Sequence, residues 1–125
     1  MKILESAENY LETILILQKR NGAVRSIDIV NELYFTKPSV SVAMKHLREN
    51  GYIEMDKNGY ITLLDAGLSI AEAIYERHTI LTNVLKDLGV PEDIAKEDAC
   101  RMEHIISEET FEAIKTHLYQ HINKQ

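Results

Sequence analysis

Residues 98–107 read DACRMEHIIS and gather three side chains that can bind a metal ion. Cys100, Glu103 and His104 stand at positions i, i+3 and i+4, the spacing that puts side chains on one face of a helix. A thiol, a carboxylate and an imidazole together are typical ligands of a first-row divalent ion. The alternative interpretation is a buried thiol beside ordinary solvated side chains.

Two other segments carry side chains of the same kind. His78 lies in YERHTIL between Ile74 and Leu81, so a partly buried imidazole there needs a polar partner. Asn9 and Glu12 stand three residues apart in the first predicted helix, near its apolar side. Oxygen, nitrogen and sulfur donors in one set suit a first-row transition metal better than calcium, which binds oxygen. The candidate metal ligands are therefore Asn9, Glu12, His78, Cys100, Glu103 and His104.

The elements that must position these side chains follow from the hydrophobic periodicity. We expect helices over residues 6–21, 27–33 and 38–50, then two short strands within residues 52–63. Three more helices are expected over residues 66–88, through the DACRMEHIIS motif, and from residue 107 onward. Pro38 suits the first turn of a helix, Gly51 suits a helix end, and Asn58-Gly59 suits a tight hairpin turn.

Three helices followed by a two-stranded hairpin are the order of a winged helix-turn-helix. The alternative is a small helical bundle with an incidental hairpin. The sequence therefore predicts a mostly α-helical protein, with a winged helix-turn-helix DNA-binding domain over residues 1–64 and a helical domain over residues 65–125.

Charge is unevenly distributed over these two parts. The chain has a net charge of −6, but residues 1–64 carry eight Lys and Arg against eight Asp and Glu. Residues 65–125 carry six against twelve, and residues 13–53 carry six against three. The excess acid thus lies in the second part, and DNA binding by the mildly basic first part is allowed.

The helix over residues 38–50 is the expected DNA-reading helix. We expect Val40, Ala43, Met44 and Leu47 to be buried, so the opposite face offers small hydroxyls and one apolar side chain to base edges and thymine methyls. Thr36 and Lys37 at its positive end suit phosphate. The alternative is that any exposed helix face looks polar. The candidate DNA contacts are Arg25, Thr36, Lys37, Ser39, Ser41, Val42, Lys45 and Lys57.

The combined motifs resemble the diphtheria toxin repressor and manganese transport regulator family of metal-activated transcriptional repressors. The resemblance runs through SAENYLETI, TKPSVSVAMKHLRENGYI, YERHTIL and DACRMEHIIS, which together span nearly the whole chain. Cys-x-x-Glu-His on a helix is the most specific of these motifs, because it is the signature of the family's primary metal site. The resemblance implies that residues 65–125 form a metal-binding and dimerisation domain, to which the first helix contributes ligands.

The resemblance assigns the metal ligands unevenly. The positions that match ligands throughout the family are His78, Glu103 and His104. Cys100 matches the iron-responsive members and Glu12 matches the manganese-responsive members, so the site is a hybrid. Because Fe(II) satisfies both the thiol and the carboxylate preferences, we expect Fe(II) first and Mn(II) next, with Zn(II) and Co(II) binding in vitro.

Three positions depart from the family pattern. Asn9 stands where the iron-responsive members have methionine and the manganese-responsive members have aspartate. Thr82 and Lys96 stand where the iron-responsive members hold a second metal ion, and neither replaces a carboxylate or an imidazole. We therefore expect this chain to have lost the second metal position in the form that the iron-responsive members have. The chain ends after its sixth predicted helix, so we expect the short, two-domain type.

The predicted function is divalent-metal-dependent repression of metal homeostasis genes by a homodimer on double-stranded operator DNA. The alternative is a metal-independent winged-helix regulator that responds to another effector. We expect no enzyme and no small organic substrate, because the sequence has no HExxH pattern, Gly-rich phosphate loop or nucleophile elbow. A single cysteine, no signal segment and no apolar run near the roughly 20 residues that span a bilayer predict a cytoplasmic protein without a membrane partner.

Overall fold

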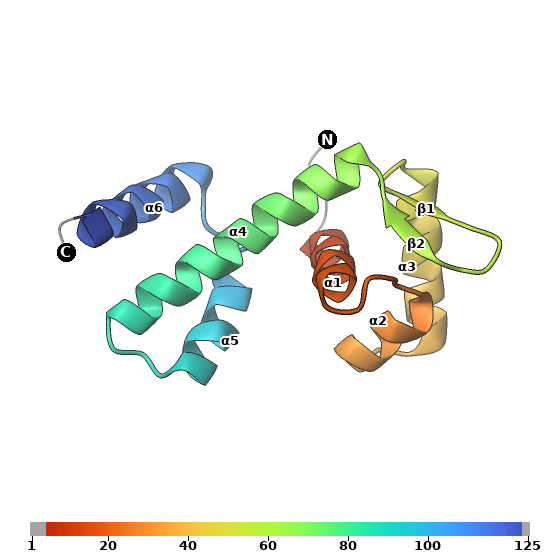
Figure 1. The fold of residues 1–125 in the computed structure, drawn as a ribbon, viewed down its shortest axis with the longest axis horizontal. Helices are drawn as coiled ribbons and strands as arrows, with labels where there is room; N and C mark the ends of the chain where they lie inside the picture. The colour runs from red at the N-terminus through yellow and green to blue at the C-terminus, as the bar shows by residue number, and fades with distance from the viewer. Residues whose placement is uncertain (1–4, 124–125) are drawn as a thin grey trace. The chain divides into compact units, whose positions relative to one another are not determined.

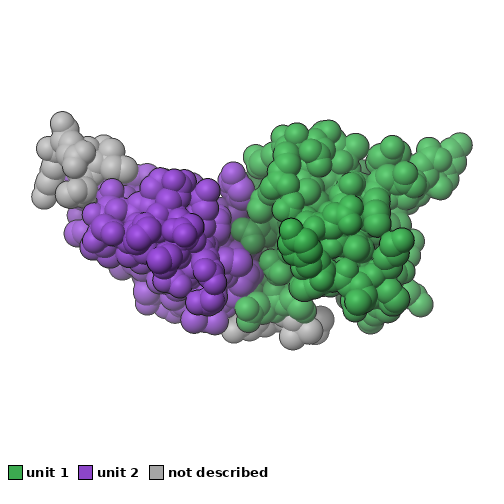
Figure 2. All heavy atoms as spheres, turned by 90° about the horizontal axis from the view of Figure 1, so that it is seen from below, with its two compact units in different colours: residues 1–73 green, residues 74–125 purple. Residues whose placement is uncertain are grey.

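The computed structural model describes residues 5–123, which are mostly helical, as the sequence predicts (Figure 1). The helices are α1 (Glu5–Asn21), α2 (Ser26–Leu33), α3 (Lys37–Glu49), α4 (Asp65–Asp87), α5 (Glu92–Met102) and α6 (Glu108–Asn123), with strands β1 (Ile53–Met55) and β2 (Ile61–Leu63) between α3 and α4. The chain divides into two compact units, Met1–Ala73 and Ile74–Gln125, which Figure 2 shows in different colours. The boundary between the two units falls within α4.

The helix-turn-helix of the first unit is set by local signals at the ends of α3. The hydroxyl oxygen of Thr36 accepts a hydrogen bond from the backbone N–H of Ser39 at 3.2 Å, which caps the start of α3. Gly51, directly after the C-cap, has a φ of +78°, a backbone conformation that glycine adopts without strain. Both ends of the expected reading helix therefore lie within a residue or so of where the sequence places them.

The hairpin of the first unit is antiparallel, with Ile53 opposite Leu63. Its turn contains Gly59 at a φ of +86°, and the Asp56 carboxylate accepts backbone N–H groups of Asn58 and Tyr60 at 2.8 and 2.9 Å. Figure 1 shows the hairpin extending beyond the helices of its own unit, as a wing does. The predicted winged helix-turn-helix is confirmed.

The first unit has its own hydrophobic core. Leu11 and Ile14 of α1 are fully buried, together with Ile29 of α2, Met44 of α3 and Ile53 of β1. Each such side chain contributes roughly 1.5–3 kcal/mol when it is fully removed from water. Because these side chains come from α1, α2, α3 and the hairpin, the core fixes α3 against α1, α2 and the hairpin.

Gly67 in the first turn of α4 lies against the backbone of Tyr52, the residue before β1. A Cβ atom there would lie 2.1 Å from the carbonyl oxygen of Tyr52, which already accepts the N–H of Leu64 at 3.0 Å. We expect Gly67→Ala to lower the free energy of unfolding by about 1–3 kcal/mol, as overpacking does, measured by urea denaturation. Ser69→Ala, at an exposed site of the same helix, should stay within about 0.5 kcal/mol. Equal midpoints for the two variants would contradict this account.

The second unit contains the later part of α4 with α5 and α6. A cluster of Ile80, Phe111 and Leu118 forms its apolar centre. The Ser107 hydroxyl oxygen accepts the N–H of Thr110 at 3.1 Å and so caps α6, as expected. Within the described part of the chain, no helix has the length and apolar character needed to cross a membrane.

Candidate metal centre and nucleic-acid interface

Helix α4 positions His78, whose side chain is partly buried, with 27% of its surface exposed. Its Nδ1 atom lies 3.0 Å from Oε2 of Glu103. The polar partner that the sequence requires for this imidazole is therefore a carboxylate from the DACRMEHIIS motif.

The expectation that one helix carries this whole motif is wrong. Helix α5 ends at Met102, and Glu103 is its C-cap residue. The Arg77 guanidinium donates hydrogen bonds to the backbone carbonyls of Glu103 at 3.1 Å and Ile106 at 3.0 Å. These hydrogen bonds from Arg77 satisfy two carbonyls of the turn that follows α5.

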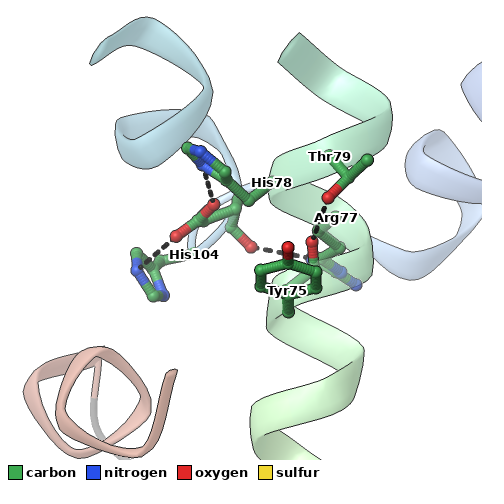
Figure 3. Close-up of polar contacts among 6 residues, drawn as sticks. Tyr75, Arg77, His78, Thr79 and His104 are labelled. Atoms are coloured by element: carbon green, nitrogen blue, oxygen red, sulfur yellow. Dashed lines mark hydrogen bonds and ion pairs between the residues drawn. The ribbon is translucent and has the colours of Figure 1, made fainter. Parts of the chain in front are cut away.

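This turn brings a carboxylate and two imidazoles together (Figure 3). The Glu103 side chain is fully buried, with Oε2 at 3.0 Å from Nδ1 of His78 and Oε1 at 3.3 Å from Nε2 of His104. The His104 side chain is only 4% exposed. A buried carboxylate flanked by two imidazoles is a set of oxygen and nitrogen donors that suits a first-row divalent ion.

The other expected ligands lie in different surroundings. Cys100 is in the last turn of α5 and is exposed, whereas Glu103 is fully buried, so the i, i+3 spacing does not give these two side chains the same environment. Asn9 is half-buried and Glu12 is buried, and both belong to α1 in the first unit. The structure thus brings three of the six expected ligands together within one unit.

Thr82 and Lys96 stand where the iron-responsive members hold a second metal ion, a position that we expect to be lost in this chain. Thr82 is buried and its hydroxyl oxygen has no hydrogen-bond partner, while Nζ of Lys96 lies 3.4 Å from the carboxylate of Glu92. Neither side chain brings a carboxylate or an imidazole of its own to the helix. That this chain lacks the second metal position of the iron-responsive members stays a prediction.

Arg77 is a residue of this centre that our sequence interpretation missed. Its guanidinium carbon lies 5.1 Å from the centre of the Phe111 ring, so the cation also packs on the start of α6. The hydrophobic pattern could have indicated this residue. Arg77 stands three residues after Ile74 and four before Leu81, which places it on the apolar face of α4. A charged side chain at such a position requires partners, and here they are the two turn carbonyls.

A second ionic contact joins α4 to α6 beside Arg77. Nζ of Lys115 lies 2.8 Å from a carboxylate oxygen of Glu76. This hydrogen bond raises the pKa of Lys115, so the ammonium stays charged at neutral pH. The contact is partly exposed and adds little to stability by itself.

The expected DNA contacts all lie in the first unit and are all exposed. Ser39, Ser41, Val42 and Lys45 occupy the face of α3 opposite its buried stripe of Val40, Met44 and Leu47. Thr36 and Lys37 are at the N-terminal end of the same helix. The arrangement presents hydroxyls, a cation and one apolar side chain on one surface, which is what base edges and phosphates require.

Arg25 and Lys57 stand outside α3 but on the wing side of the same unit. Arg25 forms an isolated β-bridge with Tyr60, and its guanidinium carbon lies 5.3 Å from the centre of the Tyr60 ring. Lys57 is exposed in the hairpin turn. Tyr60 was not among the expected site residues, although an aromatic ring beside an arginine is a common partner.

Two family profiles match this chain, one over each part. The profile described as "Iron dependent repressor, N-terminal DNA binding domain" matches residues 2–61. The profile described as "Iron dependent repressor, metal binding and dimerisation domain" matches residues 64–122. Together they cover most of the chain.

Individual relatives agree with these profiles. The transcriptional regulator MntR of Escherichia coli O6:H1 is 36% identical over 117 residues, which are 94% of this chain and 76% of that protein. A solved manganese-dependent transcriptional repressor in complex with manganese is 26% identical, with a TM-score of 0.82 over 90% of this chain and 52% of that one. A structure of ScaR with bound Zn²⁺ is 26% identical, with a TM-score of 0.71 over 90% of this chain and 53% of that one. The chain therefore spans about half the length of these two solved structures.

Proposed function

The chain belongs to the family of iron-dependent repressors, and from that premise we propose how its own residues make it a metal-dependent switch. We infer that it represses metal homeostasis genes as a homodimer on double-stranded operator DNA, with Fe(II) or Mn(II) as the activating ion. The matching profiles describe DNA binding, metal binding and dimerisation, and they describe a regulator rather than an enzyme. The observation that carries the proposal is the buried Glu103 carboxylate between His78 and His104.

The chemistry of these three side chains fits a divalent ion. A buried carboxylate is costly unless charge or hydrogen bonds compensate it. When bound, a divalent cation supplies the positive charge around which anionic and nitrogen ligands can converge. Glu103 would contribute a carboxylate oxygen and His78 and His104 would each contribute a ring nitrogen, which requires that nitrogen to be unprotonated.

We propose that Glu12, Cys100 and Asn9 complete the ligand set. Glu12 and Glu103 are the only buried carboxylates among the described residues, and both are expected ligands. Cys100 lies one helical turn before Glu103 and is exposed, so it can be deprotonated without a burial cost. Asn9 lies one turn before Glu12 on α1 and offers a neutral amide oxygen.

The mixed donor set favours Fe(II) over Mn(II) in this proposal. A thiolate prefers softer ions such as Fe(II), Co(II) and Zn(II), whereas carboxylate and amide oxygens suit Mn(II) and Fe(II). One solved relative is a manganese-dependent repressor and another has bound zinc, so sites of this fold accept more than one ion. We therefore propose Fe(II) first, Mn(II) next, and Zn(II) or Co(II) as ions that bind in vitro.

The proposed switch uses the division of the chain into two units. Glu12 belongs to the unit that carries α3, while Glu103 and His104 belong to the other unit. Ligation by all three residues would restrain the first unit against the dimerisation unit. In a homodimer, that restraint would hold the two α3 helices at the spacing of successive major grooves, roughly 34 Å. Binding of the metal ion then shifts the population toward the DNA-competent arrangement, which the protein already samples without metal. Such a regulator acts on DNA in the cytoplasm.

The proposal is tested by DNA binding of the purified chain to genomic fragments, with Fe(II), Mn(II), Zn(II) or a chelator in parallel and without oxygen. We expect specific fragments to bind about 5–150-fold more tightly with Fe(II) or Mn(II) than with chelator, the usual range of allosteric coupling. The same series of assays ranks the ions by how much each one tightens DNA binding. Equal affinity with and without chelator would support a regulator that responds to another effector.

A further inference from the structure

The turn over residues 103–106 carries two of the proposed ligands, yet its backbone has little support from regular structure. The N–H groups of Ile105 and Ile106 both donate to the carbonyl of Met102, at 3.1 and 3.2 Å. The carbonyls of Glu103 and Ile106 lie beyond the end of α5, so no helical N–H can reach them. Their partner is the guanidinium of Arg77 on α4.

Arg77 has the geometry of a side chain that fixes this turn. One nitrogen, Nη1, donates to both carbonyls, at 3.1 Å to Glu103 and 3.0 Å to Ile106. Its guanidinium also packs on the Phe111 ring of α6. Arg77 thus contacts the first and last residues of the turn from α4, and the ring on the far side limits where its guanidinium can move.

We propose that Arg77 is a positioning residue of the metal centre, which fixes the turn that presents the Glu103 carboxylate and the His104 imidazole without itself touching the ion. The inference rests on the proposed function, because it assigns Arg77 a role in that same site. It follows from the pairing of two facts: Arg77 binds the backbone of Glu103, and the side chain of Glu103 binds His78, the residue next to Arg77 on α4. The backbone and the side chain of Glu103 are therefore both held by one turn of α4.

A lysine cannot replace this arginine at full function. Lysine has a single flexible ammonium group, whereas the planar guanidinium can stack on Phe111 and donate at the same time. A metal site loses affinity when its ligands are displaced by about 1 Å. We therefore expect Arg77→Lys to keep the charge of the unit while losing the position of the turn.

The test compares Arg77→Lys and Arg77→Gln with the parent chain. Mn(II) affinity is measured by equilibrium titration, at a temperature at which the chelated variants are folded by circular dichroism. We expect at least about a tenfold loss of Mn(II) affinity, as for the loss of other residues that orient metal ligands. A second readout needs no metal: the imidazole nitrogen shifts of His104 in the chelated protein should change in both variants.

Arg101→Lys is the matched control. Arg101 is exposed near the end of α5 and pairs with Glu97 and Asp98, so its replacement should change neither readout. An Mn(II) affinity of Arg77→Lys within twofold of the parent, or failure of both Arg77 variants to fold under chelation, would overturn the inference. If the parent binds neither Mn(II) nor Fe(II), the proposed function fails as well; if the parent binds Mn(II) and Arg77→Lys binds it equally, only the inference fails.

Discussion

Replacing Glu103 by glutamine is expected to remove metal-stimulated DNA binding while both units stay folded. The Glu103 carboxylate is fully buried and lies within 3.0 Å of His78 and 3.3 Å of His104, so it is the charged centre of the site. Glutamine keeps the volume of the side chain but loses the negative charge. We expect Mn(II) affinity to fall about 100-fold or more, because losing a ligand should exceed the 10–100-fold cost of losing its outer partners. Titration with Mn(II) and fluorescence anisotropy of a selected DNA fragment measure both effects.

The glutamine variant is preferred to alanine because of where Glu103 lies. Alanine would leave a cavity in a fully buried place and would destabilise the unit for a reason unrelated to metal. Glutamine removes a buried charge, so the unfolding midpoint of the chelated variant should not fall far below that of the parent.

Glu97→Gln provides the control for this change. Glu97 is an exposed carboxylate of α5 that pairs with Arg101, so its neutralisation alters the net charge equally without touching the centre. A Glu103→Gln protein that still binds DNA more tightly with Mn(II) than with chelator would remove Glu103 from the ligand set.

The winged helix-turn-helix could be predicted because its signals are local. Pro38, Gly51 and Asn58-Gly59 each act on the backbone within a few residues, so no distant contact is needed to interpret them. The same holds for the buried stripe of α3, since a helical period assigns the inside and outside of a helix directly. The contact between His78 and Glu103 could be anticipated only as a need for some polar partner.

The path of the chain after α5 could not be predicted from local signals. The motif DACRMEHIIS has helical spacing, but α5 ends at Met102, and the carbonyl of Glu103 is bound by Arg77, which lies 26 residues away along the chain. Periodicity cannot report a hydrogen bond between distant segments. Cys100 is exposed and Glu103 is buried although the N–H of Glu103 still donates to the carbonyl of Ala99, so helical spacing alone does not report how deeply each side chain is buried.

Variants in the two units should affect different binding properties. The exposed face of α3 and its supporting core are within the first unit, and the His78, Glu103 and His104 cluster is within the second. A change on the α3 surface should therefore abolish DNA binding and leave metal affinity unchanged, whereas the Arg77 variants should lose metal affinity and, with it, metal-stimulated DNA binding. Together the two kinds of variant test whether metal occupancy and DNA reading are distinct steps.

Ser41→Glu is the change expected to have the largest effect on DNA binding itself. Ser41 is exposed on α3, where glutamate is a better helix former than serine, so the fold should be retained. A carboxylate facing DNA meets like charge, which costs several kcal/mol at an interface. At about 1.4 kcal/mol per tenfold, we expect a loss of more than about 100-fold in affinity for a selected fragment with Mn(II) present. Fluorescence anisotropy at one fixed salt concentration measures it, because salt alone changes such affinities strongly.

Ser69→Glu makes the same substitution at an exposed site of α4 and separates local contact from net charge. We expect this control to weaken DNA binding only slightly and both variants to keep the Mn(II) affinity of the parent. If Ser41→Glu and Ser69→Glu weakened DNA binding equally, the exposed face of α3 would not be the surface that enters the groove. If Ser41→Glu also lost Mn(II) affinity, the two units would not act as separable parts. The proposed order of events, in which metal binds first and DNA second, would then be wrong.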